Sequence, residues 1–92
     1  MKEKLSIIKD LIKTGKLDMA IEQLTAYIQS DTTCDDEPYY LLGNAYRKQG
    51  DWQMALNNYL EAIERNPESP ATHAHRMVMD ILNFYNKDMY NQ

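Results

Sequence analysis

The sequence predicts an all-α protein of about five helices, and three observations support this fold class. Apolar residues recur every three or four positions through most of the 92 residues, which is the period of an amphipathic helix. Glycine and proline occur only three times each, and no alternating β-branched run indicates a strand. One helix–turn–helix pattern is also written twice. Because the connections are short, neighbouring helices should be antiparallel.

The first two helices are expected over residues 3–14 and from about Asp18 to Ser30. Gly15 should end the first, since glycine takes the left-handed cap conformation without strain, and Asp18 should cap the second. The two apolar stripes that these helices must bury are formed by Leu5, Ile8, Leu11 and Ile12, and by Ala20, Ile21, Leu24, Tyr27 and Ile28.

The polar segment 30–36 is interpreted as a loop, with Asp35 or Asp36 capping a third helix that ends at Gly50. Pro38 fits in the first turn of this helix, where its missing N–H costs nothing. The fourth helix should begin at residue 51 or 52 and end near residue 65, before Pro67. Trp52 is expected to pack at the corner between these two helices.

A fifth helix is expected to start at Ser69 and Pro70 and to continue to about Lys87, and residues 88–92 are expected to fray. Its apolar face contains Ala71, Ala74, Met77, Val78, Ile81, Leu82, Phe84 and Tyr85. Either this helix rotates to cover the preceding pair, or part of the face stays exposed and supports self-association. The self-association candidates are Leu82, Phe84 and Met89.

The internal repeat has a period of 35 residues, because Gly15 aligns with Gly50 and Ala20 aligns with Ala55. Neither helix pair can bury its apolar stripe alone, so the two copies should stack. The repeat therefore predicts one small domain in which the two helix pairs stack.

The second copy carries a recognisable set of residues at fixed spacing: Tyr39, Leu42, Gly43, Tyr46, Ala55, Tyr59, Ala62 and Pro67. This set resembles the signature of the tetratricopeptide repeat, with Tyr39 in place of the usual tryptophan. The first copy keeps Gly15, Ala20 and Leu24 but diverges elsewhere. The resemblance implies a short right-handed α-solenoid in a single domain, residues 1–92. It would comprise a divergent repeat (1–34), a well-matched repeat (36–69) and a C-terminal capping helix (70–87).

The resemblance also implies a non-catalytic protein–protein interaction module whose concave groove is lined by the first helix of each repeat. Residues one turn from the buried stripe should line that groove; they are Lys2, Leu5, Lys9, Ile12 and Lys13 in the first repeat, and Glu37, Tyr40, Asn44, Arg47 and Lys48 in the second. The peptide-binding candidates among them are Lys9, Lys13, Tyr40, Asn44, Arg47 and Lys48. Their positive charge suits an acidic partner segment or a C-terminal carboxylate. The alternative is that these lysines form an ordinary solvated face.

The charge distribution agrees with a protein or peptide partner. The net charge of −4 disfavours nucleic acid, so none is expected, and a contact between RNA and the lysine-rich first helix is a weaker alternative. A second functional hypothesis is a structural subunit that assembles through the fifth helix. The protein would then be a weak homodimer, and otherwise a monomer.

No catalytic, cofactor-binding or metal-binding residues are expected. His73 and His75 are two residues apart and point in nearly opposite directions on a helix, and Cys34 is surrounded by carboxylates that disfavour its thiolate. No glycine-rich phosphate loop occurs. The sequence has no apolar run of about 20 residues, as a membrane helix needs, and no signal peptide is recognised. A cytoplasmic location is the expectation.

Overall fold

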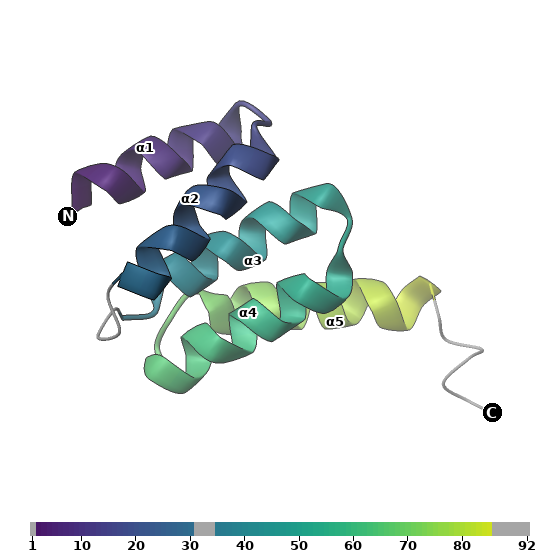
Figure 1. The fold of residues 1–92 in the computed structure, drawn as a ribbon. Coiled ribbons are helices and arrows are strands. Elements are labelled where there is room, and N and C mark those ends of the chain that lie inside the picture. The colour runs from purple at the N-terminus through teal and green to yellow at the C-terminus, as the bar shows by residue number, and fades with distance from the viewer. Residues whose placement is uncertain (1, 31–34, 86–92) are drawn as a thin grey trace.

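The computed structural model describes residues 2–30 and 35–85, which form five helices and, within those ranges, no strand. The helices are α1 (Lys2–Lys13), α2 (Leu17–Ser30), α3 (Glu37–Gln49), α4 (Trp52–Arg65) and α5 (Ala71–Tyr85). Each helix packs against the next one along the chain, and α1 also contacts α3. Figure 1 shows the result, a stack that starts with α1 and α2 and ends with α5 beside α4. The all-α helical-repeat prediction is confirmed.

Local sequence signals set most of the helix ends. Gly15 and Gly50 both adopt the left-handed conformation, with φ of 83° and 86°. The N–H of Gly50 donates to the carbonyl of Arg47, and the Asp51 carboxylate accepts from the N–H of Met54 at 3.2 Å. These contacts satisfy backbone groups that a helix end leaves without partners. The predicted turn between the third and fourth helices is therefore confirmed.

The predicted Asp18 cap is wrong, and Asp36 occupies the N-cap position of α3 without a side-chain capping bond. α2 already begins at Leu17, so Asp18 lies inside the first turn, where its carboxylate accepts from Gln49 Nε2 at 2.8 Å. Asp36 stands before α3 but has helical backbone angles and makes no side-chain capping bond. A capping carboxylate needs an extended backbone at its own residue. Asp36 Oδ1 instead accepts from Asn66 Nδ2 at 3.4 Å, so both acids bond to other helices or loops.

The core consists of two apolar clusters. The first joins α1, α2 and α3 through Leu5, Ile8, Ile12, Ala20, Leu24, Leu41, Leu42 and Ala45. The second joins α4 and α5 through Ala55, Tyr59, Ala62, Ala71 and Val78. Half-buried Tyr40 and Tyr46 pack against both clusters, so the two halves of the stack share one continuous core.

α3 and α4 pack tightly against each other at Gly43. A Cβ atom built on Gly43 would overlap Cδ1 and Cε1 of the Tyr59 ring, and that ring is completely buried. Ala55 and Ala62 are also completely buried on α4, so small side chains let the two helices approach each other. All three small residues belong to the set that resembles the repeat signature.

The last helix covers the second cluster. The Ser69 hydroxyl accepts from the N–H of Ala71, and α5 begins at that residue, one position later than predicted. Ala71 and Val78 are buried, and Ala74 and Leu82 pack against them. Leu82 was a candidate for self-association through an exposed side chain, but its side chain is half-buried in this packing. Met89 and Lys87 lie outside the described residues.

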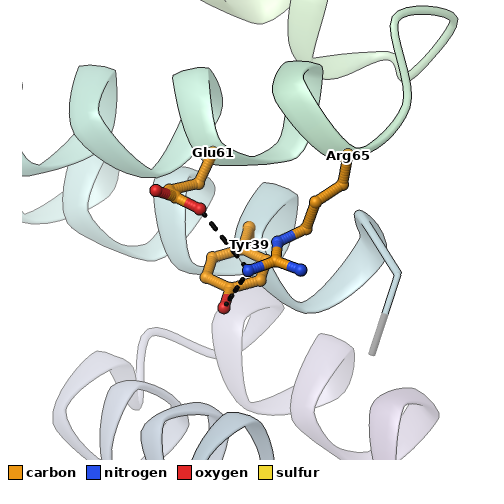
Figure 2. Close-up of polar contacts among 3 residues, drawn as sticks. All are labelled: Tyr39, Glu61 and Arg65. Carbon is orange, nitrogen blue, oxygen red and sulfur yellow. Dashed lines mark hydrogen bonds and ion pairs between the residues drawn. The ribbon is translucent and has the colours of Figure 1, made fainter. Parts of the chain in front are cut away.

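An exposed contact on α3 and α4 involves the residue that replaces the usual tryptophan. The Arg65 guanidinium lies 4.4 Å from the centre of the Tyr39 ring, and its Nη2 donates to the Tyr39 hydroxyl at 3.1 Å. Arg65 also forms an ion pair with Glu61 at 3.6 Å (Figure 2). At an exposed site such a cation–π contact contributes about 0.5–1 kcal/mol to stability. This is a small addition to the stabilisation that α3 and α4 gain by packing together at Gly43.

Candidate functional site

The candidate site is an open groove between α1 and α3 with a volume of about 290 Å³. It is lined by all six predicted peptide-binding candidates, Lys9, Lys13, Tyr40, Asn44, Arg47 and Lys48, together with Ile12 and Leu41. α1 contributes the lysines at its C-terminal half, and α3 contributes residues at one-turn intervals. The helical spacing read from the sequence thus places these side chains around one hollow.

Two aliphatic residues expected to interleave with the lysines are mostly in the core. Leu5 and Ile12 are only 5% and 6% exposed and belong to the first cluster, although Ile12 still contributes to the groove wall. By its helical spacing, each residue could lie on the buried stripe or on the groove face. Both residues are buried because α1 packs against both α2 and α3. The side chain of Lys2 lies outside the described part of the structure.

The cations around the groove are partly neutralised. Lys9 Nζ is 3.1 Å from Glu37 Oε2, and both side chains are nearly half exposed. Lys48 Nζ donates to the carbonyl of Ile12 at 3.5 Å, near the end of α1. An exposed ion pair contributes at most about 1 kcal/mol, so an incoming carboxylate could displace Glu37 at small cost.

A buried tyrosine lies beneath the centre of the groove. The Tyr59 hydroxyl donates to Asn44 Oδ1 at 2.5 Å and accepts from Arg47 Nε at 3.3 Å. Its ring is 6.1 Å from the ring of Tyr40. Tyr59 was predicted only as a packing residue of the repeat. A weak signal for a polar role was available, because the usual repeat signature has phenylalanine at this position.

Burial raises the pKa of the Tyr59 hydroxyl, and the hydrogen bond and charge of Arg47 lower it to a smaller extent. The net pKa is above the ordinary value for tyrosine, so this group stays protonated at neutral pH. The hydroxyl therefore remains available as a donor to Asn44.

The raised pKa predicts a pH dependence of stability. When the protein unfolds above about pH 10, Tyr59 can ionise, whereas in the folded protein it stays neutral. Its contribution is fully present below pH 10 and is lost as the pH rises through the folded-state pKa. We expect the free energy of unfolding to fall more steeply in the wild type than in Tyr59→Phe above pH 10. Urea titrations from pH 8 to 11 measure this difference, and parallel curves would contradict it.

The groove extends from α3 to α5. A second hollow of about 180 Å³ shares Tyr40, Asn44 and Arg47 with the first and is closed on the other side by α5. The α5 residues that line it, together with the preceding proline, are Pro70, His73, Ala74, Met77 and Ile81. His73, Met77 and Ile81 were not predicted to belong to a binding face. The available signal was the apolar stripe of the fifth helix, which is rotated toward the groove relative to a regular repeat helix.

A further hollow of about 320 Å³ lies between α1 and α2 and contains none of the six candidates. Lys4 is the only charged residue in its lining, beside Ile7, Ile8, Gln23, Ala26, Tyr27 and Ser30. It carries one cation, whereas the groove on α3 carries four, Lys9, Lys13, Arg47 and Lys48. Volume alone therefore does not make it the better candidate.

The side chains of the groove are suited to binding a ligand through hydrogen bonds and apolar contacts. Its centre presents amide, guanidinium and ammonium donors beside aromatic and aliphatic side chains. Over residues 2–30 and 35–85, no cluster of three or more His, Cys, Asp or Glu side chains could hold a metal ion. Within the same ranges, no helix has the length and apolar character needed to cross a membrane.

Comparisons with known proteins agree with the fold. A family model described as tetratricopeptide repeat matches residues 37–69. The solution NMR structure of the Bacteroides fragilis protein BF1650 is 61% identical in sequence, with a TM-score of 0.86. The match covers 96% of this chain and 89% of that one. No curated protein matches the sequence. The matched family segment contains α3 and α4, the hairpin that supplies the centre of the groove.

Proposed function

Because the chain belongs to the tetratricopeptide repeat family, whose members generally mediate protein–protein interactions without catalysis, we propose that it binds an acidic segment of another protein in the groove across α1, α3 and α5. The observation that carries this proposal is the convergence of Lys9, Lys13, Arg47 and Lys48 around one hollow. The whole chain has a net charge of −4, so the side chains that line this hollow have the opposite sign of charge to the chain as a whole.

The groove suits an extended segment with both acidic and aliphatic side chains. The α1 side supplies lysines for the carboxylates, and the α5 side supplies Met77 and Ile81 for an aliphatic side chain. Asn44 and Arg47 line both hollows, so they would contact the middle of the segment. Charge-assisted hydrogen bonds at such positions contribute about 1.5–3 kcal/mol each.

A peptide titration tests the proposal. The probe is the fluorescein-labelled peptide Ser-Glu-Asp-Leu-Glu with a free carboxyl terminus, followed by fluorescence anisotropy. We expect Asn44→Ala combined with Arg47→Ala to weaken binding by about tenfold or more, which corresponds to about 1.4 kcal/mol. Added salt should weaken wild-type binding as well, since the contacts are ionic.

The matched control is Asn57→Ala combined with Arg76→Ala. It removes the same two residue types from exposed positions on α4 and α5 that line neither hollow. This control should bind the peptide as the wild type does. Equal affinity of both double variants, or no wild-type binding, would refute the proposed groove function.

A second candidate function is self-assembly through α5, and the exposure of Phe84 favours it. Phe84 is 77% exposed and Met77 is 46% exposed, although Ala71, Ala74, Val78 and Leu82 of the same face pack in the second cluster. Sedimentation equilibrium should then show a concentration-dependent dimer that Phe84→Ser weakens. A wild type that remains monomeric at the highest accessible concentration would eliminate this function.

A further inference from the structure

We propose that Tyr59 is a specificity-determining residue of the groove, because its hydroxyl orients Asn44 and Arg47 so that the groove centre accepts a carboxylate and disfavours a neutral amide. The proposal rests on the proposed function of the groove and names the partner group that binds at its centre. Tyr59 would act through Asn44 and Arg47, so it is a positioning residue that need not touch the partner.

The direction of the two hydrogen bonds follows from the chemistry of the three side chains. A guanidinium has only donors, so the bond between Arg47 Nε and the Tyr59 hydroxyl must have the tyrosine oxygen as its acceptor. The hydroxyl proton is then available to Asn44, whose Oδ1 accepts it at 2.5 Å. The acceptor end of the Asn44 amide is thereby directed at Tyr59.

The remaining groups of Asn44 and Arg47 are donors. Asn44 keeps the two N–H bonds of Nδ2, and Arg47 keeps the four N–H bonds of its terminal nitrogens. Both residues line both parts of the groove, so these donors are available where the two hollows meet. A carboxylate can accept from several donors at once, and a planar guanidinium can bind it in a bidentate manner.

An amide in the same place would be bound less well. Its carbonyl could accept, but its NH₂ group would face donors and lose hydrogen bonds that it makes in water. An ammonium group would in addition be repelled by Arg47 and the nearby lysines. The buried Tyr59 hydroxyl therefore makes the groove prefer a carboxylate over an amide. This preference adds to the general attraction of negative groups by the positive charge of the groove.

The surroundings of Tyr59 hold this arrangement in place. Its ring is completely buried, and Gly43 leaves room for it against the backbone of α3. The raised pKa keeps the hydroxyl protonated at neutral pH. Replacement by phenylalanine would keep the packing and remove both hydrogen bonds, so Asn44 and Arg47 could rotate independently.

Nuclear magnetic resonance with acetate as the probe tests this inference without a known partner. Acetate, acetamide and sodium chloride are titrated separately into the ¹⁵N-labelled protein, with ionic strength matched for the two salts. We expect acetate to shift the Asn44 side-chain amide and Arg47 Nε–H signals more than chloride or acetamide does. In Tyr59→Phe, the acetate-induced shifts should fall to the chloride level while the backbone spectrum stays folded.

Tyr46→Phe is the matched control, because it removes a hydroxyl from the same helical hairpin without touching Asn44 or Arg47. It should respond to acetate as the wild type does. Acetate shifts that persist in Tyr59→Phe, or a wild type that does not distinguish acetate from chloride, would overturn the inference. Loss of peptide binding with an intact acetate response would instead count only against the proposed function.

A second measurement needs no variant. In the wild type, the Tyr59 hydroxyl proton should exchange slowly with water and show a nuclear Overhauser effect to the Asn44 side-chain amide. A Tyr59 hydroxyl proton that exchanges as fast as an exposed tyrosine hydroxyl would contradict the proposed orientation.

Discussion

Replacing Gly43 with alanine should destabilise the protein by about 2 kcal/mol, even though alanine favours helices by about 1 kcal/mol over glycine. The new Cβ would overlap the Tyr59 ring, which is completely buried in the second cluster and cannot move aside. Overpacking of this kind costs more than the helix preference returns. For a domain of this size the melting temperature should fall by roughly 10 °C, as measured by circular dichroism.

A double-mutant cycle shows whether Tyr59 is the cause. Gly43→Ala should cost much less in a Tyr59→Ala background, because the ring atoms that the new Cβ would overlap are then absent. A coupling free energy of about 1 kcal/mol or more between the two positions is expected. An equal cost of Gly43→Ala in both backgrounds would show that the close contact does not limit stability.

Replacing Val78 with aspartate should cost on the order of 4 kcal/mol at neutral pH. Val78 is completely buried in the second cluster with Tyr59 and Ala62. A carboxylate cannot keep its charge there, so it must be protonated, and raising a pKa from about 4 to 7 costs about 1.4 kcal/mol per unit. This is a large part of the 5–15 kcal/mol by which a typical domain is stable.

Met79→Asp provides the matched control for that experiment. Met79 is the next residue of the same helix but is 37% exposed, so its carboxylate can stay hydrated. Urea unfolding should give a much lower midpoint for Val78→Asp and a nearly unchanged one for Met79→Asp. Equal midpoints would mean that α5 does not contribute to the stability of the second cluster.

The two predictions concern features that the sequence reveals to different degrees. Gly43 was recognised as part of the repeat signature from its spacing to Tyr46 and Ala55. A small residue at a fixed position of a helix pair allows the two helices to approach closely. The rotation of α5 was not determined by its apolar stripe, which was wide enough to allow either burial or exposure. Packing against Tyr59 and Ala62 decides that Val78 is buried and that Met77 is not.

The difference between local and long-range contacts also accounts for the assignments that were wrong. Gly50 and Asp51 produce the turn between α3 and α4 through bonds to residues within five positions, so local sequence was sufficient there. Asp18 was assigned as a cap on local grounds, but its carboxylate bonds Gln49, which is 31 residues away. Leu5 and Ile12 fitted two faces of one helix, and only the positions of α2 and α3 select between these faces.

The sequence by itself determined the five helices, the repeat that makes them stack and the set of α3 and α1 residues that share one face. These depend on periodicity and on glycine and proline conformations, which act over a few residues. Only the tertiary structure decided that Glu37 partly neutralises Lys9, that α5 completes the groove, and that Tyr59 bonds Asn44 and Arg47. Such contacts depend on how whole helices rotate against one another, and that rotation is set by the complete core.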